Sequence, residues 1–181
     1  MKKLIIILLG LLVLIACVFS LRRFTSYLIQ TVTPTPPVTI TPTYEGCYYV
    51  WANQNLPEVT EKLEAAIRKL QSTASANASA FGEDCVYADG HSTFGAMETD
   101  FYVTLSIESR GDEDAMGDWI AQVMPVIDQL TGFPGGSGFV EFTFQDNEPS
   151  PLIVRVPVYK YKNEVQGLSG AELFRLFYTT P

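Results

Sequence analysis

The chain has 181 residues, with 20 acidic and 12 basic side chains and a formal net charge of −8. All 20 acids but only 8 of the bases lie in residues 44–181, which gives that segment a formal charge of −12. A segment with this much negative charge repels both phosphate backbones and anionic lipid headgroups. We therefore expect no nucleic-acid partner and no lipid contact by this part of the chain.

Residues 1–24 predict a membrane anchor or a lipoprotein signal. Lys2 and Lys3 precede an uncharged, predominantly apolar run from Leu4 to Leu21. At 1.5 Å per helical residue this run reaches ~27 Å, enough for a thin hydrocarbon core. A helix buried in a soluble protein would show a polar stripe, which this run lacks. We therefore expect an exported protein, held at the membrane by its N-terminus, with the rest of the chain on the extracytoplasmic side.

The end of this run leaves three forms of attachment open. Residues 14–17, Leu-Ile-Ala-Cys, resemble the lipobox of bacterial lipoproteins. That resemblance implies cleavage before Cys17 and acylation of the new N-terminal cysteine. The apolar run continues to Leu21 where a polar spacer normally follows, which favours an uncleaved single-span anchor. Cleavage after Ser20, with release of the protein, is the third alternative.

Residues 25–43 are predicted to form a Thr/Pro-rich linker. Residues 31–43 read TVTPTPPVTITPT, in which proline fixes φ and removes amide donors while β-branched residues disfavour helix. An extended polyproline II segment of this length spans ~40 Å. The linker is therefore expected to hold the following domain clear of the headgroups.

Residues 44–181 predict an α+β domain, a two-layer sandwich with a mainly antiparallel sheet packed by two to three helices. Apolar residues alternate or recur at helical spacing along the chain. In order, the patterns predict a strand at 47–51, a helix from Pro57 with apolar positions through Leu70, a short strand at 85–87, a strand at 99–108, a helix from 112–114 with apolar positions through Leu130, strands at 138–145 and 152–160, and a closing helix at 169–177.

The two cysteines of this domain, Cys47 and Cys85, are predicted to form a disulfide. An oxidising exterior favours pairing, and the ~39-residue loop would contribute ~4 kcal/mol on the loop-entropy model. The alternative is an envelope hydrolase that uses Cys85 with His91, the only histidine, and nearby acids. Two cysteines and one histidine match no zinc-ligand spacing, so neither a metal nor a cofactor is predicted.

Acids and aromatics supply the remaining candidates. Five acids, Glu83, Asp84, Asp89, Glu98 and Asp100, flank one predicted loop, but they match no calcium-loop spacing and are expected by chance in so acidic a domain. Outward aromatics on the predicted strands offer a face for a protein or carbohydrate ligand; the candidates are Tyr44, Tyr48, Tyr49, Trp51, Tyr102, Tyr159 and Tyr161. No catalytic residue is assigned. The sequence thus favours a membrane-tethered binding or interaction domain over an enzyme.

Overall fold

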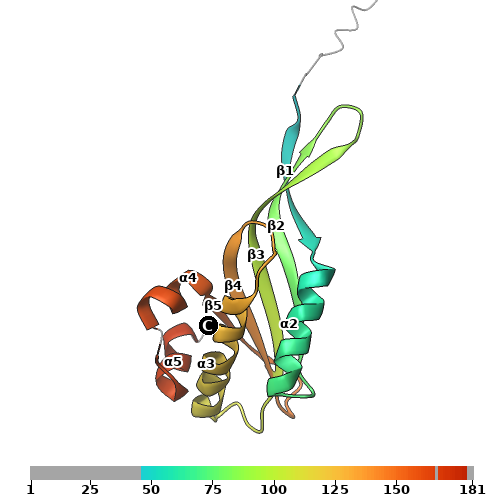
Figure 1. The fold of residues 1–181 in the computed structure, drawn as a ribbon. Coiled ribbons are helices and arrows are strands. Elements are labelled where there is room, and N and C mark those ends of the chain that lie inside the picture. The colour runs from blue at the N-terminus through green and yellow to red at the C-terminus, as the bar shows by residue number, and fades with distance from the viewer. Residues whose placement is uncertain (1–45, 166, 179–181) are drawn as a thin grey trace, which may run out of the picture. The chain divides into compact units, whose positions relative to one another are not determined.

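A computed structural model describes residues 46–165 and 167–178, so the predicted anchor, the linker and Tyr44 lie outside it. The chain forms five strands and four helices with one π-helical turn over this part (Figure 1). In order they are β1 (Tyr48–Asn55), α2 (Pro57–Leu70), β2 (Ser75–Val86), β3 (Ser92–Ser106), α3 (Glu113–Gln129), β4 (Gly136–Gln145), β5 (Leu152–Pro157), α4 (Val158–Lys160), the π turn Tyr161–Val165 and α5 (Gly170–Phe177).

The strands form one sheet in the order β1-β2-β3-β4-β5. Three of the four pairings are antiparallel, and β3 pairs with β4 in parallel. The parallel pair arises because α3 crosses over between the two strands, whereas the short 146–151 turn returns β5 antiparallel to β4. The expected α+β class and mainly antiparallel sheet are confirmed.

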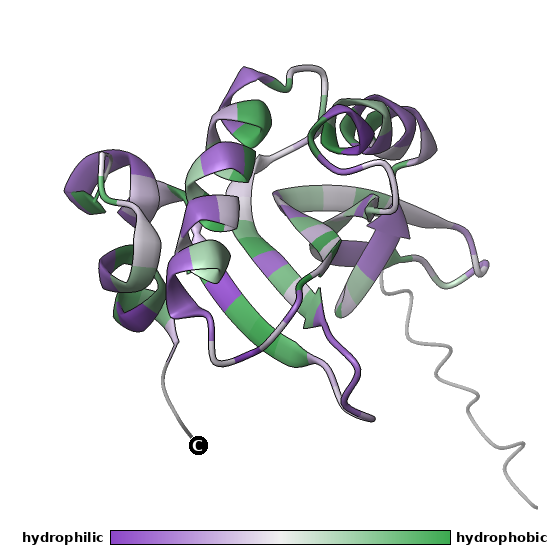
Figure 2. Cartoon of the chain, turned by 90° about the horizontal axis from the view of Figure 1, so that it is seen from below, coloured by the Kyte–Doolittle hydropathy of each residue, from purple (hydrophilic) through white to green (hydrophobic). Residues whose placement is uncertain are grey.

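The core lies between the helices and one face of the sheet. Buried residues alternate with more exposed ones along much of β2, β3, β4 and β5, as a sheet with one covered face requires, whereas β1 has no buried residue. Figure 2 shows the helices along one side of the sheet and this alternation of hydrophobic and hydrophilic positions. The largest fully buried side chains are Phe101, Phe142, Phe144, Phe174, Leu63, Ile67, Leu105, Met116, Ile120, Met124, Ile127 and Leu173. The strand and helix periodicities read from the sequence therefore define the core correctly.

Several boundaries and the number of helices differ from the sequence prediction. Strand β2 begins at Ser75, well before the expected strand at 85–87, because Ala76, Ala78 and Ala80 are small enough to be buried beneath α2. Strand β5 ends at Pro157, where proline cannot continue the ladder, and the chain turns into α4 and the π turn. This short helix raises the number of helices among the described residues to four, so the expected two to three was wrong.

Helix α5 is fixed to α3 by a close backbone approach. A side chain at Gly117 would overlap the carbonyl of Gly170, so only glycine allows the two helices to come this near. Asp118 and Asp114 of α3 accept hydrogen bonds from the amides of Gly170 and Ala171, at 2.9 and 2.8 Å. Carboxylates at a helix N-terminus accept hydrogen bonds from its free N–H groups, and their negative charge interacts favourably with the positive end of the helix dipole. The acids of α3 thus act as caps for α5.

The first three strands continue past the helices as a twisted arm (Figure 1). We define the arm as residues 46–55 and 79–98, which comprise β1, the end of β2, the hairpin turn and the start of β3. A register shift lies between Phe81 and Gly82, and a side chain at Gly82 would overlap the carbonyl of Gly95. A bulge and a close glycine contact increase the local twist, which is consistent with the twisted shape of the arm.

Candidate functional site

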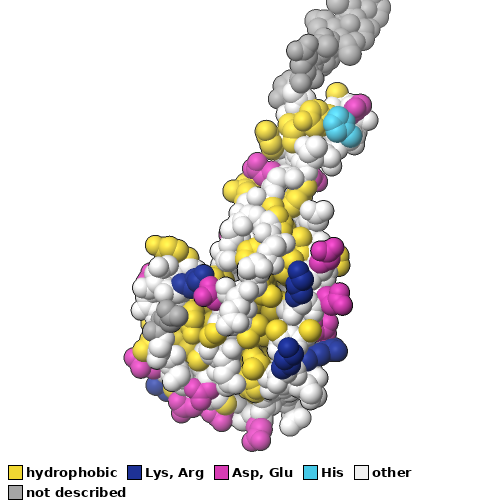
Figure 3. Space-filling view, in the orientation of Figure 1, with side chains coloured by type: hydrophobic (Ala, Val, Ile, Leu, Met, Phe, Trp, Pro, Cys, Tyr) yellow, Lys and Arg dark blue, Asp and Glu magenta, His cyan; other side chains and the backbone are white. Residues whose placement is uncertain are grey.

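The arm carries most of the exposed large hydrophobic side chains. Five of the nine such residues in the described chain lie on it. They are Tyr48, Tyr49, Val50, Trp51 and Met97, with Tyr49 and Trp51 each 66% exposed. Figure 3 shows hydrophobic side chains along the visible face of the arm. Exposed aromatics gathered on one element are typical of a contact surface, whereas single exposed apolar residues are not informative.

The open face of the arm continues the face of the sheet that the helices leave uncovered. Residues opposite one another in antiparallel strands share a face, which places Tyr49 with Cys85 and Trp51 with Glu83. The rings of Trp51 and Phe81 stack at 5.3 Å between centroids. Trp51 is therefore held by its neighbour while most of its surface remains exposed.

A shallow hollow of about 360 Å³ lies beside this face, near the end of the arm. Its lining combines the aromatic residues Tyr49 and Tyr87 with one acidic residue, Glu83. Aromatic faces attract cations, and a carboxylate adds a direct partner for one. A second hollow of similar volume is lined by Asp84 and Phe94 among others, which pair across β2 and β3 and so lie on the face of the arm opposite to Tyr49 and Glu83.

The arm is uniformly acidic. It holds four acids, Glu83, Asp84, Asp89 and Glu98, and no lysine or arginine, since residues 46–55 and 71–109 contain neither. The described lysines and arginines all belong to the body of the domain, as Figure 3 also shows on its visible face. The arm therefore presents aromatic rings within a field of negative charge.

At the end of the arm, Cys47 and Cys85 are joined in a disulfide, with Cα atoms 5.2 Å apart. The bond ties the start of β1, where the chain leaves the linker, to β2. With its sulfur so bonded, Cys85 offers no thiolate, and a thiolate is what a nucleophilic cysteine requires. This geometry disfavours the alternative of a hydrolase that uses Cys85.

His91 lies in the hairpin turn rather than in a cleft. Its ring stacks on Tyr87 at 4.1 Å between centroids, and more than half of its side chain is exposed. The backbone amide and the ring of His91 both hydrogen-bond Asp89, which lowers the pKa of that carboxyl below its ordinary value. These contacts close the turn, and they bring no other acid to the histidine.

Of the five candidate acids, the structure brings two together. Glu98 and Asp100 lie around Gly138, where any side chain would overlap Asp100. Asp100 is 5% exposed and accepts a hydrogen bond from the amide of Phe139 at 3.2 Å. Burial, reinforced by the charge of Glu98, raises the pKa of Asp100. Within residues 46–165 and 167–178, no group of three or more His, Cys, Asp or Glu side chains could hold a metal ion.

The remaining candidate aromatics are dispersed. Tyr102 lies on the uncovered sheet face in edge contact with Phe139, Tyr159 is exposed on α4, and Tyr161 is buried. Phe81, Phe94 and Met97 belong to the arm but were not identified from the sequence, because most of β2 and the start of β3 were not recognised as strands. The alternation of Ala76, Ala78 and Ala80 was the available signal for β2.

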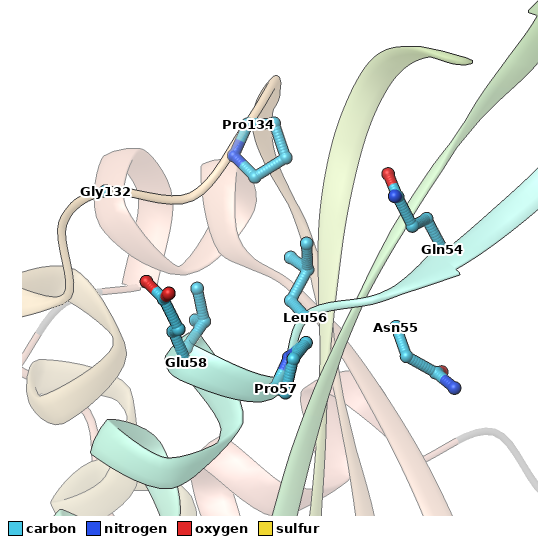
Figure 4. A pocket seen from close by; sticks show the side chains of 8 residues that line it. Gln54, Asn55, Leu56, Pro57, Glu58, Gly132 and Pro134 are labelled. Atoms are coloured by element: carbon cyan, nitrogen blue, oxygen red, sulfur yellow. The ribbon is translucent and has the colours of Figure 1, made fainter. Parts of the chain in front are cut away.

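A further hollow, of about 270 Å³, lies where β1 passes into α2 (Figure 4). Gln54 and Asn55 end the strand beside it, Glu58 lies in the first turn of the helix, and the 132–134 loop closes the other side. The carboxylate of Glu58 already occupies the helix N-terminus, the place that would otherwise suit an anion. We therefore assign no ligand to this hollow.

Comparison with protein-family models, curated proteins and solved structures finds no match to this chain. Nor is any helix in the described part long and apolar enough to cross a membrane.

Proposed function

We propose that this protein is a membrane-tethered, extracytoplasmic interaction protein of the cell envelope, and that the arm is its contact surface. The observation that carries the proposal is the row of exposed aromatic and aliphatic side chains on β1. Placing such side chains in water is unfavourable unless a partner covers them for part of the time. A partner protein fits better than a carbohydrate, because the exposed residues follow a strand edge rather than line a closed pocket.

The tether in this proposal comes from the sequence. Residues 1–24 supply the anchor or lipid attachment and residues 25–43 the extended linker, as the apolar run and the Thr/Pro composition predict. Cys47 comes shortly after the linker in the sequence, and the disulfide joins it to Cys85 of β2. A bond at that point would keep β1 paired with β2 when a bound partner pulls on the tether.

Site-specific photo-crosslinking in the native membranes tests the proposal. Tyr49 is replaced by benzoylphenylalanine in one variant and Tyr159, a similarly exposed tyrosine on α4, in a matched control. We expect a discrete cross-linked adduct from position 49 and none from position 159. Equal adducts at both positions, or none at position 49, would contradict a contact surface on the arm.

A further inference from the structure

The two edges of the sheet are built differently. Strand β5 has six residues, follows Pro151, ends at Pro157 and carries the charge of Arg155, all of which discourage pairing with another chain. Strand β1 has eight residues, YYVWANQN, with no proline and no charge. In the part of the chain that the structure describes, no other strand pairs with its outer edge. One edge is thus protected and the other is left suitable for an added strand.

The charge around β1 indicates the kind of strand that fits there. Four acids and no lysine or arginine lie on the arm. A second copy of this chain would bring the same acids and would be repelled, whereas a basic segment would be attracted. The complementary partner is therefore a basic peptide segment.

The hollow beside Tyr49 offers a place for one basic side chain. Tyr49 belongs to the edge strand, Glu83 lies on β2 on the same face, and Tyr87 follows β2 at the turn. Neighbouring strands lie about 4.8 Å apart, so a long side chain from an added strand can cross Tyr49 towards Glu83. Its cation would meet aromatic rings and a carboxylate together.

We propose, on the basis of the proposed function, that the arm binds an extended basic segment of a partner protein as a sixth strand along β1. Backbone hydrogen bonds to the outer edge of β1 hold the segment, as in other cases of strand addition. Lysine or arginine side chains at alternate positions face the side of Tyr49 and Trp51, and one of them occupies the hollow beside Glu83. The aliphatic stems of these side chains pack on the exposed rings.

The test uses the full chain in non-ionic detergent micelles and a capped peptide of four Thr-Lys repeats as the probe. A Thr-Glu peptide of equal length and a Thr-Lys peptide N-methylated at alternate residues are the controls. We expect calorimetric binding of the Thr-Lys peptide that weakens with salt, no binding of the Thr-Glu peptide, and loss of binding on N-methylation. Slower amide hydrogen exchange in residues 48–55 would locate the bound peptide on β1.

Two variants of the chain distinguish binding in the hollow beside Glu83 from general electrostatic attraction to the acidic domain. Glu83→Gln should weaken Thr-Lys binding about three- to fivefold, the effect of one partly exposed charge partner. Glu61→Gln, which removes an exposed carboxylate from α2, should leave the affinity unchanged. Equal losses in the two variants would overturn the role of Glu83.

Failure of this inference and failure of the proposed function can be told apart. Adducts from position 49 without binding of the Thr-Lys peptide would overturn the basic strand but leave the arm as a contact surface. An adduct at the mass of two chains, lost in Trp51→Lys, would identify a second copy as the occupant and also overturn the inference. Absence of adducts at position 49 would overturn the proposed function itself.

Discussion

Asp100 is a carboxylate that the fold holds at a cost in stability. It is almost fully buried in β3 and accepts a hydrogen bond from the backbone amide of Phe139, and Glu98 adds a like charge nearby. Burial raises its pKa in the folded protein above the ordinary value of an aspartate. The ionised form is therefore less stable in the folded state than in the unfolded chain, where water surrounds it.

We expect Asp100→Asn to stabilise the protein at neutral pH, because asparagine keeps an oxygen for the Phe139 amide without the charge. The sign follows from linkage. A raised folded-state pKa means that stability increases as the pH falls through that pKa towards the ordinary value, and the variant should lose this increase. Urea unfolding of both proteins between pH 7 and pH 4 measures it, with Glu61→Gln as the control. A destabilised variant at pH 7 would contradict the account.

The Cys47–Cys85 pair makes a second prediction at this scale. The structure places both sulfurs in one bond, and the loop between them contains α2 and most of β2. Reduction should therefore lower the free energy of unfolding by up to ~4 kcal/mol on the loop-entropy model. Thiol labelling of unreduced, unfolded protein should find no free thiol in residues 44–181. Two labelled cysteines there would disprove the disulfide. For the stability measurement, the Cys47→Ser/Cys85→Ser double variant shows the free energy of unfolding without the bond.

At the scale of the elements, α3 and α5 depend on a glycine contact. Gly117→Ala places a methyl group against the backbone carbonyl of Gly170. The overlap can be relieved only if α3 and α5 move apart. We expect a loss of at least ~1–3 kcal/mol, the usual range for overpacking. Gly111→Ala is the matched control, because its methyl group would meet only the Ser109 hydroxyl, at an ordinary 3.5 Å. Urea denaturation compares the two, and similar stabilities would contradict the contact.

The strands that could be predicted from the sequence are those whose buried positions hold large apolar side chains. Strand β4 and the central part of β3 alternate large apolar residues with polar ones, so their buried positions were evident from the sequence. Strand β2 uses alanine where those strands use phenylalanine and valine, and a row of small residues resembles a loop. The parallel pairing of β3 with β4 could not be predicted locally, because it depends on where α3 crosses the sheet.

The candidate site was only partly visible for the same reason. Tyr48, Tyr49 and Trp51 were identified as outward aromatics, and the structure exposes all three. That they stand on a free edge with acids beside them required the strand order, which sequence patterns do not provide. The stacking of Phe81 on Trp51 likewise depends on a register that the unrecognised part of β2 determines.

For the molecule as a whole, we expect residues 44–181 to fold without the preceding segment. They form one compact unit with its own core, and the linker composition gives it little apolar surface to pack. Expressed in an oxidising compartment, this fragment should unfold cooperatively on heating, as calorimetry or circular dichroism would show. A fragment that aggregates, or melts without a cooperative transition, would show that the domain needs its N-terminal segment.

The last prediction concerns how the N-terminus is attached to the membrane. An uncleaved span from Leu4 to Leu21 would keep the protein in the membrane through a carbonate wash and preserve its full mass, because about 18 apolar residues leave lipid only at a prohibitive cost. Cleavage before Cys17 would remove sixteen residues and add acyl chains to that cysteine. We expect the intact span, because the apolar run continues past Cys17 to Leu21 where a lipoprotein tether would be polar.

Intact-mass measurement of the membrane-extracted protein decides between these forms. The full mass would support the span, whereas a diacylated or triacylated N-terminus at Cys17 would show that expectation to be wrong. Cys17→Ser supplies the control. It should change the mass of an uncleaved protein only by the substitution itself and leave its membrane attachment intact, because the apolar run and not the thiol holds it in lipid. In a lipoprotein the same substitution would abolish acylation.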